Sequence, residues 1–404
     1  MPALFKASQF KQVKVIDAIT QTESIQDILL TSDGNFQIGL DSPPEDVEIS
    51  DRSGLILGTG LVDMYSHSGE PGFEKRETLS SLTASAKNGG FSQVGILPNT
   101  QPAIDNATAT EFWRSHSLFL PWGGITINCE GKAITDLAEL APHVVGFSDG
   151  KPISNLALVR RVMEYVKPLH KPLMLWAWHS NLAESGVMRE GKWSLQYGLA
   201  GIPEIAETVA LASLLELVAL TKTPTHFMKI STARSVELIA QAKNSHLPVT
   251  ASVCWMNLWQ SDQDLHSYDP NLRLSPPLGN SEDRAALING IKNGTIDAIA
   301  VDHTPYTYEE KTVDFESAPS GVIGLELILA TLWQELVVTE KLTPLELWQA
   351  LSIRPAQCLN LDPQNLKLAT LFDPNQTWTV KAIASLSTNT SVYGKTLTGK
   401  VLRP

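Results

Sequence analysis

Cysteine is scarce in this 404-residue sequence, which contains only Cys129, Cys254 and Cys358. Their odd number and wide spacing exclude a disulfide framework and a Cys-x-x-Cys metal site. So few cysteines are typical of proteins that work in a reducing compartment, and we expect this one to be cytoplasmic.

Clustered positive charge is also missing. The chain has 31 Lys and Arg residues against 43 Asp and Glu residues, which gives a net charge of −12, and it has no basic run. Binding to nucleic acid or to an anionic membrane surface needs clustered Lys and Arg, so neither is an expected partner.

Long uninterrupted apolar runs are absent as well. The polar N-terminal segment lacks the apolar stretch of a secretory signal. The longest apolar stretch, at 322–338, contains Glu326 and Glu335 at a spacing that predicts an amphipathic helix rather than a membrane span.

What the middle of the chain does have is a repeating alternation of short β-branched or aromatic runs with helical patterns. The clearest helical patterns are at 203–221 and 233–244. The predicted strands are 61–66, 93–97, 124–129, 144–147, 173–178, 226–230, 249–254 and 298–301. Eight such units predict a (β/α)8 barrel; an open doubly wound sheet is the main alternative, but the even spacing favours closure.

The two ends of the chain show strand-like alternation between turn signals. These signals lie at 32–34, at 41–44 and near Asn375 and Gly394. We predict that residues 1–56 and 360–404 combine into a small composite β-sandwich domain beside a barrel of residues 57–359.

Short motifs follow the predicted strands, at the strand ends where barrel enzymes carry their chemistry. Residues 60–72 read GLVDMYSHSGEPG, and residues 98–102 read PNTQP. Further motifs are FSDG at 147–150, GVM at 186–188, GLAGIP at 198–203, IST at 230–232, PPL at 276–278, GTID at 294–297, DHTP at 302–305, EK at 310–311 and FDPN at 372–375. In this order the motifs resemble those of dihydroorotases and allantoinases, within the cyclic amidohydrolase superfamily.

The resemblance implies a hydrolase that opens or closes a cyclic amide with the help of zinc. Zinc lowers the pKa of a bound water and polarises the carbonyl group. In this family the ligands are two His after strand 1, a carboxylate after strand 4, a His after each of strands 5 and 6, and an Asp after strand 8, which also handles the proton.

Carried over position by position, only part of this ligand set is present. His67, Asp149 and Asp302 occupy ligand positions, whereas the other three ligand positions hold Tyr65, Trp176 and Lys229. Lys229 would repel a metal ion, and Trp176 would fill the volume that a ligand needs. We therefore expect an incomplete metal site with no cofactor, in which Asp302 is a vestigial catalytic residue.

The substrate-binding positions are depleted in the same way. Asn99 remains, but Gly69 stands where the family has a carboxylate-binding Arg. Ser275 and Tyr306 replace two further substrate contacts, an Asn and a His. Asn99 is therefore interpreted as a vestigial substrate residue.

Several residues admit more than one interpretation. His179 could be a displaced ligand of strand 5 or a loop residue, and His226 could be a ligand or a packing and hydrogen-bonding residue. Cys254 could be a nucleophile with His303 as its base, or a small core residue. Finally, the tryptophans Trp176, Trp178 and Trp255 could form an aromatic platform for a ligand or simply fill the barrel.

Two functions from different classes follow. One is a catalytically inactive dihydroorotase-like protein of pyrimidine biosynthesis, which forms a homo-oligomer such as a dimer. The resemblance implies a structural role for it beside aspartate transcarbamoylase. The other is an active cyclic amidohydrolase of the dihydroorotase or allantoinase type with a reduced zinc site. A small-molecule sensor built on the old pocket is a third possibility.

The interpretation as an inactive protein leads to a prediction about the surroundings of Asp302. If no metal is bound, a buried Asp302 needs another counter-charge. We therefore predict that the Lys229 ammonium lies within about 4 Å of Asp302, the reach of an ion pair.

Overall fold

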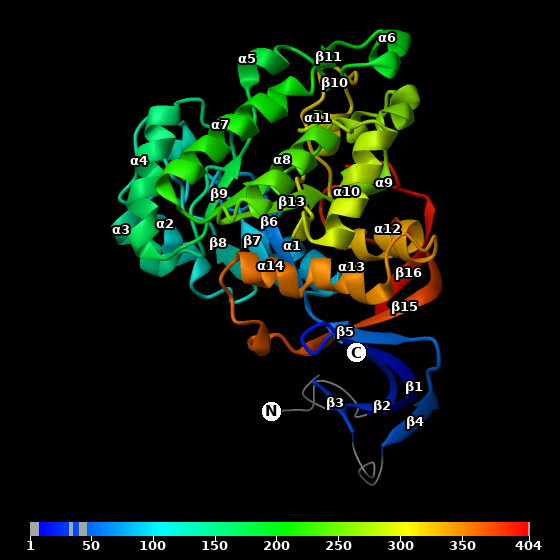
Figure 1. Cartoon of the computed structure of the whole chain (residues 1–404). Helices are drawn as coiled ribbons and strands as arrows, with labels where there is room; N and C mark the ends of the chain where they lie inside the picture. Colours follow the sequence, from blue (N-terminus) through cyan, green and yellow to red (C-terminus); the bar gives the residue numbers. More distant parts are fainter. Residues whose placement is uncertain (1–7, 32–34, 40–46, 403–404) are drawn as a thin grey trace.

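The computed structural model describes residues 8–31, 35–39 and 47–402. Parallel strands form a barrel in the middle of the molecule (Figure 1). One group of neighbours is β6 (Leu61–Ser66), β7 (Phe91–Ile96) and β8 (Phe119–Pro121). The other is β9 (Leu173–Trp176), β12 (Thr225–Met228), β13 (Val249–Cys254) and β14 (Ala298–Ala300).

Backbone hydrogen bonds join the two groups into a closed ring. On one side Phe147 forms parallel bridges with both Gly123 and Leu173, which fills the fourth strand position. On the other side the Asp302 amide donates to the Tyr65 carbonyl at 3.1 Å, which links the end of β14 to β6. The predicted closed barrel is therefore confirmed, and the open sheet is wrong.

Two of the predicted barrel strands are displaced or reduced, whereas the other six lie at the predicted places, with ends that differ by at most two residues. The strand predicted at 124–129 lies earlier, as β8, and residues 127–129 form a 3₁₀ turn. Asn128 and Cys129 have φ values of 52° and 53°, in the left-handed region, which a strand does not allow. The strand predicted at 144–147 is reduced to the bridge at Phe147.

Helices surround the barrel (Figure 1). The main ones are α1 (Leu79–Asn88), α4 (Leu156–Val166), α7 (Ile205–Thr221), α8 (Ala233–Asn244), α10 (Ser281–Asn293), α12 (Ile328–Leu332), α13 (Pro344–Leu351) and α14 (Ile353–Cys358). Thr78, Asn155, Thr232 and Asn280 start four of these helices by accepting hydrogen bonds from backbone N–H groups of the first turn.

Shorter elements lie in the loops around the barrel. They include α5 (Ser180–Ala183), β10 (Met188–Arg189), α6 (Lys192–Tyr197), β11 (Gly201–Ile202), α9 (Met256–Trp259) and α11 (Tyr308–Lys311). In Figure 1, α5, β10, α6 and β11 belong to a segment that protrudes above the barrel.

Strands from both ends of the chain pair in one sheet, drawn in the lower part of Figure 1. The strands are β1 (Ser8–Asp17), β2 (Thr22–Leu30), β3 (Phe36–Ile38), β4 (Glu48–Asp51), β5 (Ile56–Thr59), β15 (Leu368–Thr379) and β16 (Thr396–Leu402). Their order is β16-β15-β5-β1-β2-β3, with β4 beside β1. The domain boundaries stay a prediction, and the turns predicted at 32–34 and 41–44 lie outside the described residues.

The apolar stretch at 322–338 folds into α12 followed by a π-helical turn at Trp333–Val337. Its apolar residues are mostly buried, whereas Glu326 and Glu335 are half-buried. Within the described part of the chain, no helix has the length and apolar character needed to cross a membrane.

Candidate functional site

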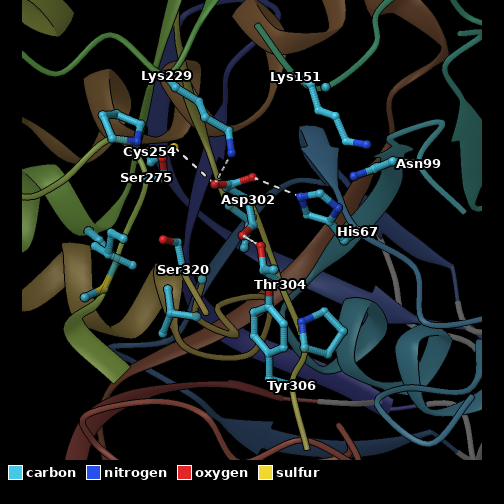
Figure 2. A pocket seen from close by; sticks show the side chains of 18 of the residues that line it. His67, Asn99, Lys151, Lys229, Cys254, Ser275, Asp302, Thr304, Tyr306 and Ser320 are labelled. Atoms are coloured by element: carbon cyan, nitrogen blue, oxygen red, sulfur yellow. Dashed lines mark hydrogen bonds and ion pairs between the residues drawn. The ribbon is translucent and has the colours of Figure 1, made fainter. Parts of the chain in front are cut away.

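A buried ion pair lies at the mouth of the barrel (Figure 2). Lys229 follows β12 and Asp302 follows β14, and their Nζ and Oδ2 atoms are 2.7 Å apart. The Lys229 side chain is only 6% exposed. The prediction that Lys229 lies within ion-pair distance of Asp302 is confirmed.

The backbone at both residues is unusual. Lys229 has φ 60° and Asp302 has φ 51°, so both lie in the left-handed region that residues with a Cβ rarely adopt. Such conformations cost free energy and persist where the surrounding structure fixes them. Here they turn the ends of β12 and β14, the two neighbours of β13, so that the side chains meet in the barrel mouth.

Aromatic rings surround the Lys229 ammonium. Its Nζ lies 4.8 Å from the centre of the Trp176 ring and 6.0 Å from that of Tyr65. A cation over an aromatic face is attracted by the ring quadrupole. The buried positive charge is thus stabilised by Asp302 on one side and by π-electrons on others.

Tyr65 is fully buried and bonded to neighbouring strand ends. Its hydroxyl accepts a hydrogen bond from the Lys229 backbone N–H at 3.1 Å and lies 3.2 Å from Ser252 Oγ. Burial raises the pKa of the Tyr65 phenol well above its ordinary value, so the group is neutral. Tyr65 holds strands together below the cavity.

His67 and Asn99 lie on the other side of Asp302 (Figure 2). His67 Nε2 is 3.8 Å from Asp302 Oδ1, and the Asn99 side chain is hydrogen-bonded to His67. Burial lowers the pKa of His67 to about 4, an effect that the nearby Asp302 opposes. At neutral pH the imidazole is therefore uncharged, and Lys229 is the principal counter-charge of Asp302.

Asp149 does not join this group. It is buried, and its carboxylate accepts hydrogen bonds from the Thr126 backbone N–H at 2.9 Å and from the Thr126 hydroxyl at 2.6 Å. Burial raises its pKa. The structure thus brings His67 and Asp302 together but turns Asp149 toward the neighbouring loop.

A cavity of about 470 Å³ opens above the ion pair. All four substrate positions singled out in the sequence line it: Gly69, Asn99, Ser275 and Tyr306. The cavity is also lined by His67, Lys151, Trp176, Lys229, Cys254, Asp302 and Arg76, among others. Its volume is that of a site for a small molecule.

Comparisons with known proteins agree with this architecture. A probable dihydroorotase-like protein of Synechocystis is 41% identical, over 97% of this chain and 98% of its own length. A dihydroorotase of Syntrophus aciditrophicus is 36% identical over 96% of this chain and 95% of its own. A model of the dihydro-orotase-like family matches residues 54–235. The chain belongs to the dihydroorotase-like family.

Solved structures of related barrels support the fold of this dihydroorotase-like chain. An L-hydantoinase from Arthrobacter aurescens superposes with a TM-score of 0.81, at 20% identity, over 98% of this chain and 93% of its own. A dihydropyrimidinase from Brevibacillus agri gives a TM-score of 0.80, at the same identity, over 98% of this chain and 92% of its own. At such low identity these matches establish the fold alone.

The residues present in this dihydroorotase-like chain do not fit the zinc site that the sequence resemblance implies. Asp302 is bound by an ammonium, and Asp149 is bonded to Thr126. Over the described residues, no group of three or more His, Cys, Asp or Glu side chains is placed to hold a metal ion. Structural and catalytic zinc sites need at least three protein donors.

His179 and His226, the two possible replacement ligands, lie outside the cavity of the dihydroorotase-like barrel. His179 precedes α5 and does not line the cavity. His226 is buried, with both ring nitrogens 2.8 Å from hydroxyls of Thr250 and Ser252. The packing and hydrogen-bonding interpretation of His226 is confirmed, and burial lowers its pKa to about 3.

Cys254 and His303 do not form a nucleophile and base. The Cys254 thiol lies 3.8 Å from Asp302 Oδ2, and burial raises its pKa. His303 instead lies 3.4 Å from Glu77 and accepts a hydrogen bond from the Gly324 backbone. The thiol therefore stays protonated, and His303 is not the base beside it.

Trp176 and Trp178 lie together, with ring centres 5.9 Å apart, but Trp255 does not join them, so the three tryptophans do not form one platform. Trp255 is completely buried in the core, and Trp178 packs in a small cluster with Ile202. Trp176 alone lines the cavity.

Sequence reasoning missed two cations in the cavity wall, Lys151 and Arg76. Lys151 stands two residues after Asp149, so its place after the fourth strand position could have marked it. Arg76 lies in the long loop between β6 and α1, where no motif marks it. Its Nε donates to Glu310 at 3.0 Å, and its guanidinium lies 4.8 Å from the Tyr306 ring centre.

Proposed function

We propose that this protein is a catalytically inactive dihydroorotase-like protein of pyrimidine biosynthesis that acts as a structural partner of aspartate transcarbamoylase. The ion pair between Lys229 and Asp302 carries the proposal. Asp302 occupies the position where the family resemblance places a zinc ligand that also handles the proton. An ammonium 2.7 Å from its carboxylate repels a dication and occupies the acceptor oxygen.

The substrate side supports the same proposal. The family resemblance places a carboxylate-binding Arg at position 69, which is Gly69 here. A Cβ built on Gly69 would lie 2.7 Å from the Glu77 backbone nitrogen and closer still to its carbonyl oxygen. The loop therefore leaves no space for any side chain at this position.

Metal analysis and turnover test the inactive state. We expect the purified protein to contain far less than stoichiometric zinc, and neither to close carbamoyl aspartate nor to open dihydroorotate when zinc or manganese is added. An active dihydroorotase assayed in parallel is the positive control. Stoichiometric zinc that is lost in Asp302→Asn, or turnover that follows added metal, would contradict the proposal.

Co-expression with the catalytic chain of aspartate transcarbamoylase from the same cell tests the partner. We expect one complex of fixed ratio on size-exclusion chromatography with light scattering, in which the dihydroorotase-like chain is itself oligomeric. Its interface should bury more than about 1,000 Å², the usual floor for a specific contact. Separate elution at micromolar concentration, with transcarbamoylase assembly unchanged when this chain is deleted, would remove the partner from the proposal.

An active metal-dependent cyclic amidohydrolase is the second candidate. The observation in its favour is that His67 and Asp302, two family ligand positions, lie 3.8 Å apart in a cavity that also retains Asn99. For this candidate the Lys229 ammonium would have to leave Asp302 before a metal enters. The metal and turnover measurements described above distinguish the two candidates.

A further inference from the structure

The outward face of α7 is apolar. The exposed residues of this helix are Ile205, Val209, Ala212, Glu216 and Leu220, which recur every three or four positions and so lie on one side of it. Ile205, Val209 and Leu220 are 46%, 43% and 63% exposed. The opposite side of α7 packs on the barrel core. A helix that is apolar on both sides is usually buried on both sides, which predicts that another surface covers the outward face.

The helix beside it, α8, has an ordinary polar surface. Figure 1 shows α7 between α4 and α8, and α7 packs against both. The exposed residues of α8 are Arg234, Glu237, Gln241 and Asn244, all of them polar. The apolar face is therefore specific to α7 and does not follow from its place in the ring of helices. A contiguous exposed apolar face is typical of a contact with another protein.

The face is symmetric about its middle, which indicates what kind of protein covers it. Ile205 and Leu220 are equally far from the midpoint between Ala212 and Ser213. When a second α7 packs antiparallel across a two-fold axis at this midpoint, Ile205 of each copy lies opposite Leu220 of the other. The small side chains of Ala212 and Ser213 let the two helices approach closely. The Ser213 hydroxyl donates to the Val209 carbonyl at 2.9 Å, so it brings no unpaired donor into the contact.

The charges at the ends of α7 fit the same arrangement. Glu204 precedes the helix and Lys222 follows it, and both are exposed. Lys167 Nζ donates to the Thr221 carbonyl at 2.7 Å, which adds a second ammonium at the C-terminal end. In an antiparallel pair the acidic end of each helix meets the basic end of the other, whereas in a parallel pair like charges would meet. Glu216, the one charged residue of the face, does not lie opposite its own copy.

We propose that two copies of this chain form a two-fold symmetric dimer in which their α7 helices pack antiparallel through this outward face. The inference deepens the proposed function and rests on it only for the homo-oligomer, since it needs no aspartate transcarbamoylase. Leu156 and Tyr165 of the adjacent α4 are 42% and 60% exposed and would widen the contact. A stable dimer needs a total buried area above about 1,000 Å².

Light scattering on the full-length chain alone, at micromolar concentration, tests the dimer. We expect twice the mass of one chain. Ala212→Arg places a large cation from each copy beside the two-fold axis, and should raise the dissociation constant at least about a hundredfold, since like charges and a steric clash coincide. Leu195→Arg is the matched control, because Leu195 is an apolar residue of α6 that is 85% exposed and lies outside the face. Unchanged far-ultraviolet circular dichroism would exclude misfolding.

A charge exchange tests the antiparallel orientation. Glu204→Lys alone, or Lys222→Glu alone, should raise the dissociation constant about fivefold to thirtyfold at low salt, since two ion pairs are lost per dimer. The double variant should recover most of the affinity, because the exchanged charges again meet in opposite pairs. Glu282→Lys, at an exposed position of α10, is a control that should leave the dissociation constant unchanged.

Three results would overturn the proposal. One is a chain that is monomeric on its own at micromolar concentration. Another is a dimer that Ala212→Arg leaves intact, which would keep the homo-oligomer of the proposed function but place it on a different surface. The third is a monomer whose complex with aspartate transcarbamoylase is lost in Ala212→Arg, which would assign the face to that enzyme. An α7 dimer that does not bind aspartate transcarbamoylase would instead support this inference while removing the partner from the proposed function.

Discussion

At the scale of single residues, the Lys229–Asp302 pair places two charges where water scarcely reaches, with side chains 6% and 15% exposed. Removing one member of a buried pair leaves an uncompensated charge, which typically costs about 3–5 kcal/mol. Lys229→Met and Asp302→Asn should each lower the free energy of unfolding, with Lys229→Met the more harmful because an amide at position 302 can still accept a hydrogen bond from the ammonium, whereas Met cannot donate one to the carboxylate.

Urea denaturation of both single variants and of the double variant measures this coupling. We expect the double variant to be more stable than the sum of the single effects predicts, since residues in direct contact are not additive. Strict additivity would mean that the two charges do not stabilise each other. Arg234→Met, at an exposed pair with Glu237, is a control that should change stability little.

His226 makes stability depend on pH. Its pKa is about 3 in the folded protein and near 6.5 when the chain is unfolded. Because the folded pKa is lowered, the unfolded chain binds the proton first as the pH falls below 6.5. The stability due to neutral His226 is complete above that pH, and is lost by about 1.4 kcal/mol per pH unit between about 6.5 and 3.

Unfolding free energies measured across this pH range test the effect. Substituting the exposed His246 by Gln should leave the slope as it is, whereas His226→Gln should reduce it. A His226→Gln variant that keeps the full acid slope would assign that slope to other groups.

At the scale of elements, the loop after β6 is fixed by close backbone packing at Gly69. Since a Cβ there would overlap the Glu77 backbone, Gly69→Ala should destabilise the protein by about 1–3 kcal/mol, as overpacking does. Gly124→Ala is a milder comparison, because its nearest neighbours, Cys129 Sγ and the Thr126 carbonyl oxygen, would both lie 3.3 Å away. Thermal unfolding of both variants shows which substitution lowers the melting temperature more. Equal decreases for Gly69→Ala and Gly124→Ala would contradict the packing argument.

Regular elements were the easiest to predict. The strands at 61–66 and 249–254 and the helix at 233–244 match the structure to the residue, because short runs rich in β-branched or aromatic residues mark the strands and apolar residues at helical spacing mark the helix. The third and fourth strands were not predictable in this way. Left-handed residues at 128 and 129 and a single bridge at Phe147 depend on tertiary contacts that leave no local pattern.

The same limit applies to the site. Burial and opposite charge were enough to predict that Lys229 and Asp302 meet. The position of Asp149 was not predictable, since Thr126, 23 residues earlier, supplies its hydrogen bonds. The closure of position 69 likewise depends on the path of the Glu77 backbone, which no motif encodes.

At the scale of the whole molecule, the ends of the chain and the barrel depend on each other. Strand β5 pairs with β1 on one side and with β15 on the other, so the C-terminal segment covers an edge of β5. Glu77, in the loop after β6, also accepts a hydrogen bond from the Leu386 backbone at 3.1 Å. The C-terminal segment thus contacts both the sheet and the mouth of the barrel.

A chain that ends at residue 366 should therefore fail to form a stable monomer. It would expose the edge of β5 and the apolar residues that pack on Phe372, and exposed strand edges promote aggregation. Size-exclusion chromatography and thermal unfolding test this. A truncated chain that stays monomeric and melts cooperatively at the same temperature would show that the segment is dispensable.

The left-handed turns at Lys229 and Asp302 bring a lysine of the chain itself to the buried carboxylate, as its counter-ion. A counter-ion that is part of the polypeptide is delivered once, during translation, in a fixed amount, and no chelator, competing ion or starvation can change its occupancy. We expect the protein to accumulate to equal levels, and to melt at the same temperature, whether cells grow with abundant zinc or with almost none.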